Sequence, residues 1–382
     1  MEKVVTLITG GEVMTPASAG TTDILLVLDR IARIGRVDAD RLDILDIPVR
    51  VIDARGRLVI PGIIDPHEHL LGGGGEGGMS SHTPELSLRE IIMGGVTTVV
   101  GCLGVDTRMK TMAGLLAKAK GFREESLNAH LWSGGYSVPP RSLLDSVRED
   151  IMFIDEVIGA GEIAISDHRS VQPGLDELAR LVIEARIGGM IGNKAGVTHF
   201  HVGAEKEGLD PIRKLLENFP IPPECIYPTH VERNEKLLLE AVELTKRGVT
   251  VDIDTVEQDL PRWLRLYLEM GGDPQCLTLS SDSGSNGPGS LLRQIARAVT
   301  EVSLPLEMIL RMVTLNTARV LHMDEVGELA TGKSADVVIL ERGSLEVVHV
   351  FARGRHMVRD GAPSIEEKFR QGKTSRWSRD EF

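Results

Sequence analysis

The chain has 382 residues, 42% hydrophobic and 26% charged, with 41 glycines that follow no strict period; this composition is typical of a globular protein and excludes fibrous and low-complexity classes. Its formal net charge of −13 opposes binding to nucleic acid or to an anionic membrane. No apolar run reaches the roughly 18 residues of a membrane span and the three cysteines show no CxxC spacing, so we expect a cytoplasmic protein whose thiols are reduced and buried.

The two ends of the chain are both rich in short runs typical of β-strands. Residues 1–59 include KVVTLITGGEVM and VRVIDARGRLV, and residues 326–382 include GELATGKSADVVILE and VVHVFARGRHMVRDG. Neither end has enough apolar surface to fold well alone. We therefore expect the two ends to pair into one small β-sandwich domain.

Residues 60–325, between those ends, alternate apolar runs of strand length with longer segments of helical period. The segments at 175–189 and 234–248 space their apolar residues three and four apart and end at glycine, as amphipathic helices do. Repeated alternation of strand and helix predicts a parallel (β/α)8 TIM barrel, with a doubly wound open sheet as the alternative. The eight strand-length runs are VIPGIIDPHEH, VTTVVGCLG, AHLWSGGY, EIAISDHRS, VTHFHVG, CIYPTHVERN, VTVDIDTV and LTLSSDSGS.

Polar or ionisable residues end most of these runs, where the chemistry of such barrels takes place. His67 and His69 are two residues apart, so on a strand they face the same side. Neutral imidazole is the commonest metal ligand, although HxH alone is equally compatible with ordinary polar strand residues. His201, His230 and Asp282, at the ends of later runs, favour a metal bound across the barrel mouth.

These motifs resemble the amidohydrolase superfamily. The resemblance covers nearly the whole chain and is closer to the isoaspartyl dipeptidases within that superfamily, through the segments PGIIDPHEHLLGGGGEGG, SGGYSVPPR, AISDHRS, GVTHFHVG, PTHVERN and TLSSDSGS. It implies a zinc-dependent hydrolase whose metal ligands include His67, His69, His201, His230 and Asp282.

One position departs from the pattern of the superfamily. The family usually has a lysine on the fourth strand, carboxylated by CO2, whose carbamate bridges two zinc ions, and the matching residue here is Glu162. Glutamate also offers two oxygens to two cations, so we expect two Zn2+ per subunit bridged by Glu162. A glutamate that faces solvent, beside a single metal ion, is the alternative.

The glycine-rich loop and two arginines are expected to bind the substrate. The resemblance implies a small anionic β-aspartyl dipeptide, whose α-ammonium group Glu76 would hold with the backbone of Gly74 nearby. A phosphate cradle is disfavoured because no Lys-Ser/Thr follows these glycines and a carboxylate would repel phosphate. Arg169 and Arg233 suit bidentate recognition of the two carboxylates of such a dipeptide.

Two further positions bear on the substrate. Ser285 resembles the residue that binds the aspartyl α-carboxylate, with Asn286 as a substitute. Val105 stands where the family more often has a hydroxyl, which leaves the leaving amino acid open.

The implied reaction is hydrolysis by a metal-bridging hydroxide. Asp282 would act as general base and then general acid, and Tyr136 would donate a hydrogen bond to the oxyanion. A cyclic amidase of the dihydroorotase or hydantoinase kind would use the same metal centre, and a catalytically silent scaffold is a third hypothesis. The family resemblance also implies a homo-oligomer, with the octamer as its common form.

Overall fold

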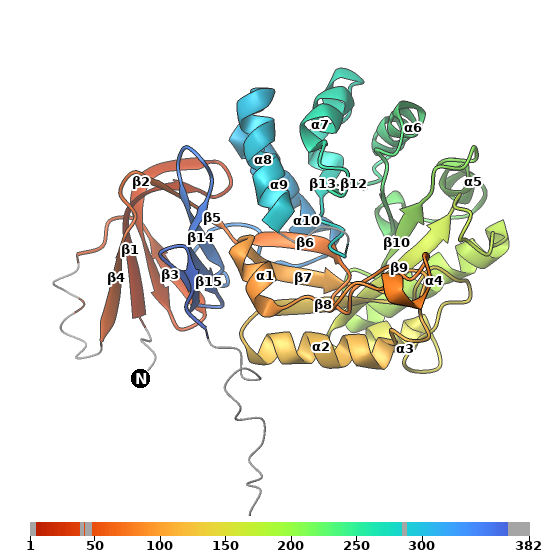
Figure 1. The fold of residues 1–382 in the computed structure, drawn as a ribbon, viewed down its shortest axis with the longest axis horizontal. Coiled ribbons are helices and arrows are strands. Elements are labelled where there is room, and N and C mark those ends of the chain that lie inside the picture. Colours follow the sequence, from red (N-terminus) through yellow and green to blue (C-terminus); the bar gives the residue numbers. More distant parts are fainter. Residues whose placement is uncertain (1–4, 39–41, 43–47, 285–288, 366–382) are drawn as a thin grey trace, which may run out of the picture.

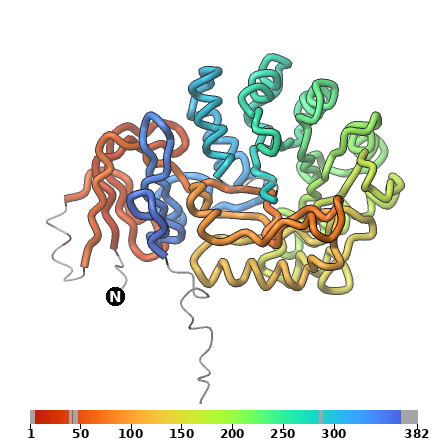
Figure 2. Tube along the Cα trace, in the orientation of Figure 1, coloured from red at the N-terminus to blue at the C-terminus, as the bar shows by residue number. Residues whose placement is uncertain are grey.

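The computed structural model describes residues 5–38, 42, 48–284 and 289–365, and it contains a parallel β/α barrel beside a separate β-rich region (Figure 1). The trace in Figure 2 shows the red N-terminal strands and the blue C-terminal strands side by side, to one side of the barrel. The fold class expected from the alternating strands and helices, a TIM-type α/β barrel, is confirmed.

Eight parallel strands form the barrel. Six of them pair in sequence order in one sheet, and the last two pair with each other in a second, shorter ladder. All their residues except Asn128 and His130 of β8 are buried, which explains why most of the runs read as continuously apolar instead of alternating. The strands are β6 (Ile63–Glu68), β7 (Val96–Gly101), β8 (Asn128–Ser133), β9 (Val157–Ile165), β10 (Val197–Val202), β11 (Ile226–Thr229), β12 (Val251–Ile253) and β13 (Leu277–Leu279).

The first and last strands are joined by hydrogen bonds just beyond the ladder residues. The His69 N–H donates to the Ser283 carbonyl at 3.0 Å, and the Ser281 N–H donates to Asp65 Oδ1 at 3.1 Å. These contacts bring the end of β13 against the end of β6, so the side chains that follow both strands meet at one rim.

Side chains link β11, β12 and β13 inside the barrel. Buried Asp252 accepts hydrogen bonds from the hydroxyls of Thr229 at 2.8 Å, Thr278 at 2.6 Å and Ser280 at 2.6 Å. A buried carboxylate is tolerated only when it is well satisfied, and here it ties three strands together beneath the rim.

Amphipathic helices cover the outside of the barrel. The predicted helix at 175–189 is observed as α4 (Leu175–Gly192), and that at 234–248 as α6 (Glu235–Thr245), whose N-cap Asn234 accepts a bond from the Leu237 N–H at 2.9 Å. No helix within residues 5–38, 48–284 and 289–365 is long and apolar enough to cross a membrane. The other helices are α1 (Leu88–Met93), α2 (Met112–Glu124), α3 (Val147–Phe153), α5 (Asp210–Asn218), α7 (Leu260–Glu269), α8 (Gly289–Glu301), α9 (Leu306–Met312) and α10 (Leu315–Val320), with short 3-10 turns η3 (Met79–Ser81), η4 (Pro223–Cys225) and η5 (Pro274–Cys276).

The β-rich region is one nine-stranded hydrogen-bonded sheet drawn from both ends of the chain. The order along its main path is β17-β16-β15-β14-β5-β1-β2-β3, and β4 pairs with β1 off this path. Its strands are β1 (Val5–Met14), β2 (Ser18–Val27), β3 (Arg30–Ile34), β4 (Val49–Asp53), β5 (Arg57–Pro61), β14 (Val337–Glu341), β15 (Val347–Ala352), β16 (Arg355–Arg359) and β17 (Ala362–Pro363).

Pairing of β5 with β14 joins the two chain ends. The strands run antiparallel in a five-residue register in which Ile339 opposes Val59. Ile339 is fully buried in a cluster that also contains Ile24 and Ile31 from the N-terminal strands. The apolar core of this region therefore needs residues from both termini.

We expect Ile339→Ala to lower the free energy of unfolding by about 2–5 kcal/mol, because it removes buried methyl groups and leaves a cavity between strands from the two ends. Urea denaturation followed by circular dichroism measures the change, and Val51→Ala, at a side chain that is 58% exposed, serves as the control. A loss below about 1 kcal/mol for Ile339→Ala would show that the two termini do not share a core.

Candidate metal centre

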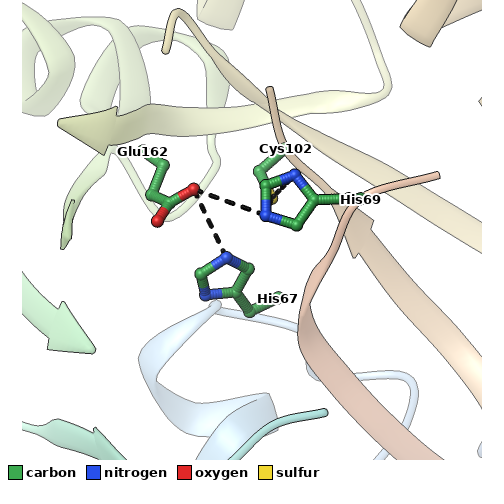
Figure 3. Close-up of side chains that lie close together, drawn as sticks. All are labelled: His67, His69, Cys102 and Glu162. Carbon is green, nitrogen blue, oxygen red and sulfur yellow. Dashed lines mark hydrogen bonds and ion pairs between the residues drawn. The ribbon is translucent and has the colours of Figure 1, made fainter. Parts of the chain in front are cut away.

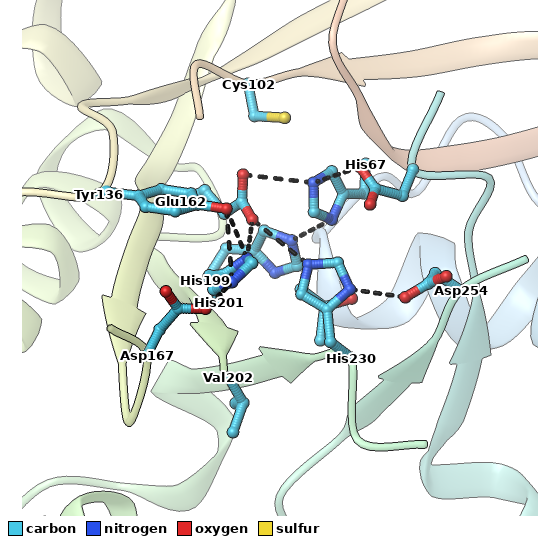
Figure 4. A network of polar contacts seen from close by, with 12 residues as sticks. His67, Cys102, Tyr136, Glu162, Asp167, His199, His201, Val202, His230 and Asp254 are labelled. Carbon is cyan, nitrogen blue, oxygen red and sulfur yellow. Dashed lines mark hydrogen bonds and ion pairs between the residues drawn. The ribbon is translucent and has the colours of Figure 1, made fainter. Parts of the chain in front are cut away.

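The expected metal ligands lie close together at the barrel rim, and Figure 4 shows four of them: His67, Glu162, His201 and His230. His67, near the end of β6, is fully buried, and its Nε2 lies 3.4 Å from Glu162 Oε2 and 3.4 Å from Asp282 Oδ1. His69 follows the same strand, with its Nε2 3.2 Å from Asp282 Oδ1 and 3.8 Å from Glu162 Oε2. The two imidazoles therefore face the same two carboxylates from one side, as expected for residues two apart on a strand.

Glu162 lies in the middle of this cluster and comes from β9. Its carboxylate is 1% exposed, so the alternative in which it faces solvent is wrong. Oε1 lies 2.6 Å from His201 Nδ1 and 3.4 Å from His230 Nε2, while Oε2 faces His67. Burial alone would raise the pKa of Glu162, but the imidazoles of His67 and His201 outweigh it and hold that pKa well below its usual range.

Two further carboxylates orient the histidines of β10 and β11. His230 Nδ1 lies 2.6 Å from Asp254 Oδ2, so its Nε2 points at Glu162. His201 Nε2 lies 3.0 Å from Asp167 Oδ2. A carboxylate on one ring nitrogen fixes the tautomer and rotation of an imidazole and makes the other nitrogen a better ligand.

His230 and Asp282 both have left-handed backbone conformations, with φ of 64° and 45°. His230 directly follows β11, and Asp282 lies three residues after the end of β13. Such conformations are uncommon for residues other than glycine, although asparagine, aspartate and histidine adopt them more often than other side chains, and they cluster at functional sites. The turn that each residue makes directs its side chain across the barrel mouth instead of along the strand.

The donor set fits divalent metal ions. Within the described residues, His67 Nε2 and Glu162 Oε2 are buried and have no hydrogen-bond partner. Four groups of side chains among the described residues place their ligand atoms within 4.8 Å of one another: His67, His230 and Asp282; Glu162, His201 and His230; His67, His69, Cys102 and Glu162; and His230, Glu232 and Asp254. Imidazole, carboxylate and thiol are ligands typical of zinc and other first-row transition metals.

Cys102 belongs to this cluster, although its sequence context gave no sign of it. It follows β7 directly, is 1% exposed, and its Sγ lies 3.7 Å from His69 Nδ1. Figure 3 shows it beside His69, on the same side of Glu162 as His67. The thiol is buried as expected, but the sequence gave no signal that it would contact His69. Burial raises the pKa of this thiol, and the imidazoles of His69 and His67 more than offset that effect, so the pKa is lowered.

His199 contacts the cluster through the ring of His67. Its Nε2 lies 3.2 Å from His67 Nδ1, its Nδ1 lies 3.0 Å from the Tyr227 carbonyl oxygen, and its ring stacks on Trp132 at 5.1 Å between centroids. Burial lowers its pKa well below the usual range, and the neighbouring His67 adds to this effect. A neutral His199 held on both nitrogens keeps the His67 ring in place.

A cavity of about 300 Å³ opens onto the metal centre. Its lining includes Glu76 of the glycine-rich loop and the predicted binding residues Gly74, Tyr136, Arg169 and Arg233, together with Val105. The structure thus brings together the substrate-binding residues expected from sequence, except Ser285, which lies outside the described residues.

Arg169 connects the mouth of the cavity to its floor. Its Nη1 donates to Glu76 Oε1 at 3.0 Å, its Nη2 donates to Asp167 Oδ2 at 2.8 Å, and Nη2 also lies 3.0 Å from His201 Nε2. Asp167 therefore orients both a histidine of the centre and an arginine of the pocket. The hydrogen bond to Asp167 raises the pKa of Arg169 despite its partial burial, so its positive charge is permanent.

Tyr136 and Arg233 stand on either side of His201. The Tyr136 hydroxyl lies 2.9 Å from His201 Nδ1, and burial together with the Glu162 charge raises the pKa of Tyr136 well above its usual value. Arg233 Nε donates to the Val202 carbonyl at 2.8 Å, which anchors the guanidinium while its Nη2 reaches to 3.5 Å from His201 Nε2. A protonated phenol and a fixed guanidinium can both donate to an anionic ligand in the cavity.

Comparison with known proteins gives a consistent family. The model of the amidohydrolase family matches residues 58–358. The crystal structure of a beta-aspartyl dipeptidase from Fervidobacterium islandicum AW-1 has a TM-score of 0.88 and 37% sequence identity, over 95% of this chain and 99% of that chain. A structure of the enzyme from the same organism in complex with the β-Asp-Leu dipeptide has a TM-score of 0.86 and 36% identity, with the same coverage.

Curated relatives are more distant. Adenine deaminase 2 of Rhizobium meliloti (strain 1021) is 26% identical over 330 residues, which are 81% of this chain and 50% of the relative. The chain thus spans about half the length of the curated adenine deaminases that it matches. A dihydroorotase of Halalkalibacterium halodurans is 35% identical over only 94 residues, which are 25% of this chain.

We expect Glu162→Ala to lower the metal bound per chain from the two ions expected to one or fewer, because it removes the one carboxylate among the described residues that faces imidazoles from β6, β10 and β11. Inductively coupled plasma mass spectrometry after dialysis measures the metal content. Glu205→Ala, at an exposed residue outside the cluster, controls for the loss of a surface carboxylate. Unchanged metal content in Glu162→Ala would exclude Glu162 as a ligand.

Proposed function

The chain belongs to the amidohydrolase family, and on this premise we propose that it hydrolyses β-aspartyl dipeptides at a centre of two Zn2+ ions. The metal ligands would be His67, His69, Glu162, His201, His230 and Asp282, with Glu162 bridging in place of a carboxylated lysine. The likeness at 37% identity to a beta-aspartyl dipeptidase supports this choice of substrate.

The charge pattern of the cavity carries the proposal. Glu76 and Arg169 form an ion pair of 3.0 Å at the mouth, and Arg233 stands farther in, beside His201. A β-aspartyl dipeptide has one ammonium group and two carboxylates, so it can satisfy this one anion and these two cations. On binding, Glu76 and Arg169 would give up their ion pair and form ion pairs with the substrate instead. Both side chains would thus stay paired, which limits the free-energy cost of removing them from water.

The residues around the scissile bond have separate tasks. Bound divalent cations would supply Lewis acidity, which polarises a carbonyl and lowers the pKa of water. Asp282 would take a proton from the attacking water and deliver it to the leaving nitrogen, because an amide anion is a very poor leaving group. Tyr136 would donate its hydroxyl proton in a hydrogen bond to the developing oxyanion, and Glu76 would hold the ammonium group with the Gly74 backbone.

Other expectations belong to the same proposal. Residues 60–325 would form the hydrolase domain, and residues 1–59 and 326–382 a small β domain that supports it. A cytoplasmic location, a homo-oligomeric assembly with the octamer as the common form of the family, and Ser285 as a ligand of the aspartyl α-carboxylate remain predictions.

A cyclic amidase remains the second candidate, because a dihydroorotase matches part of the chain and would use the same metal centre. The ion pair of Glu76 and Arg169 favours the dipeptide, since a cyclic amide has no free ammonium group for Glu76 to bind.

We expect the zinc-loaded protein to hydrolyse β-Asp-Leu, and to leave α-Asp-Leu, dihydroorotate, hydantoin and adenine unchanged. Chromatography of the products decides between them, because a dipeptide releases leucine, dihydroorotate and hydantoin give an open ureido acid, and adenine gives hypoxanthine and ammonia. Asp282→Asn should lower kcat by about 10²- to 10⁴-fold, whereas Asp176→Asn, at an exposed aspartate of α4, should not. Turnover of a cyclic amide without turnover of β-Asp-Leu would select the second candidate, and no turnover of any compound would favour a silent scaffold.

We expect Arg233→Gln to raise KM for β-Asp-Leu by about 10- to 100-fold, because it removes a charge-assisted hydrogen bond worth about 1.5–3 kcal/mol. Steady-state kinetics measures the effect, and metal content should not change. Arg265→Gln, at an exposed arginine of α7, is the control. An unchanged KM would exclude Arg233 from binding the substrate.

A further inference from the structure

Cys102 occupies a position in the metal centre that neither the HxH motif nor the other predicted ligands account for. Its N–H donates to the Glu68 carbonyl at 3.0 Å, which fixes its backbone against β6 between the two histidines of the motif. Its sulfur, His67, His69 and Glu162 place their ligand atoms within 4.8 Å of one another (Figure 3).

A simple thiol hydrogen bond explains this contact poorly. The sulfur lies 3.7 Å from His69 Nδ1 and 3.9 Å from His69 Nε2. A hydrogen bond is directed at one ring nitrogen, in line with its lone pair, whereas nearly equal distances to both nitrogens place the sulfur away from either lone pair. The sulfur therefore lies beside the His69 ring without a directed hydrogen bond to either of its nitrogens.

Glu162 leaves room for another ligand on this side of the centre. Its Oε1 lies 2.6 Å from His201, whereas Oε2 stays 3.4 Å from His67 and 3.8 Å from His69. The glutamate therefore lies nearer to β10 than to β6, as its short side chain would predict. The sulfur of Cys102 is on the β6 side, where Glu162 Oε2 and His67 Nε2 are buried and have no hydrogen-bond partner among the described residues.

We propose that the Cys102 thiolate is a further ligand of the metal ion held by His67 and His69. Bond lengths of about 2.3 Å for Zn–S and 2.0–2.1 Å for Zn–N put two ligand atoms of one ion within about 4.4 Å, so a set within 4.8 Å needs only small side-chain adjustments. The inference rests on the proposed metal centre and is independent of the substrate.

A thiolate ligand has consequences for the choice of metal. Sulfur is a soft ligand that favours zinc and discriminates against magnesium and calcium, which bind oxygen. It also adds a third negative charge to those of Glu162 and Asp282, so two divalent ions and these ligands together have a net charge of about +1. The ions would then be weaker Lewis acids than with the two carboxylates alone.

The test uses the full-length protein stripped of metal by a chelator and reloaded with Co2+. We expect wild type and Cys225→Ser to bind cobalt and to show a near-ultraviolet thiolate-to-cobalt charge-transfer band. Cys102→Ser should lose the band. It should also bind Co2+ at least about tenfold more weakly, because removal of a residue that only hydrogen-bonds a metal ligand already lowers metal affinity by about 10- to 100-fold. Cys225 is a matched control, because it is also buried but packs in an apolar cluster.

A second measurement needs no variant and guards against misfolding of Cys102→Ser. X-ray absorption at the zinc edge of the wild-type protein should show sulfur at about 2.3 Å. Bound metal without sulfur scattering or a charge-transfer band would overturn the proposal, and so would a band that survives in Cys102→Ser. Wild-type protein that binds neither metal would overturn the metal centre as well. A sulfur signal in protein that fails to cleave β-Asp-Leu would support the ligand and refute only the substrate.

Discussion

The carboxylate of Glu162 is the buried charge on which the arrangement of the barrel rim depends. It is surrounded by imidazoles from β6, β10 and β11, and a buried carboxylate without such partners would cost several kcal/mol. Parallel strands all end at the same rim, so a barrel can bring these partners from distant parts of the sequence to one point. The polar layer of Asp252 and its hydroxyl partners lies beneath it, so the barrel interior changes from apolar to polar as it nears the rim.

Around this charge, three of the histidines are each held in place by a second residue. Asp254 holds His230, Asp167 holds His201 and His199 holds His67. Metal sites need ligands whose rotation is fixed before the ion arrives, because a loosely held ring loses affinity through entropy. Asp167 has a further effect, since it also binds Arg169 and so couples the position of a ligand to the shape of the pocket.

The charges of the cavity would reconcile an acidic protein with the anionic substrate proposed for it. A net charge of −13 would repel a dipeptide that carries two carboxylates, but the charge is spread over the whole surface and is screened beyond about 8–10 Å. Arg169 and Arg233 line the cavity within reach of any ligand, where their fields act at short range. Glu76 supplies the opposite charge at the mouth. The pocket would therefore favour a ligand whose ammonium and carboxylate groups match these positions, and not only one with a suitable net charge.

Periodicity and motif alone predicted the eight strands, the helices α4 and α6, and most of the residues that meet at the rim, because parallel strands bury both faces and polar residues therefore stand out at their ends. The HxH spacing determined that His67 and His69 share a face, and the family resemblance marked Glu162 as a carboxylate in place of a lysine. Only the tertiary structure decided which oxygen of Glu162 faces which histidine, that one continuous sheet joins the two chain ends, and that Cys102 lies against His69. These outcomes depend on side-chain directions and distances between segments far apart in the chain, and no local pattern of residues encodes them.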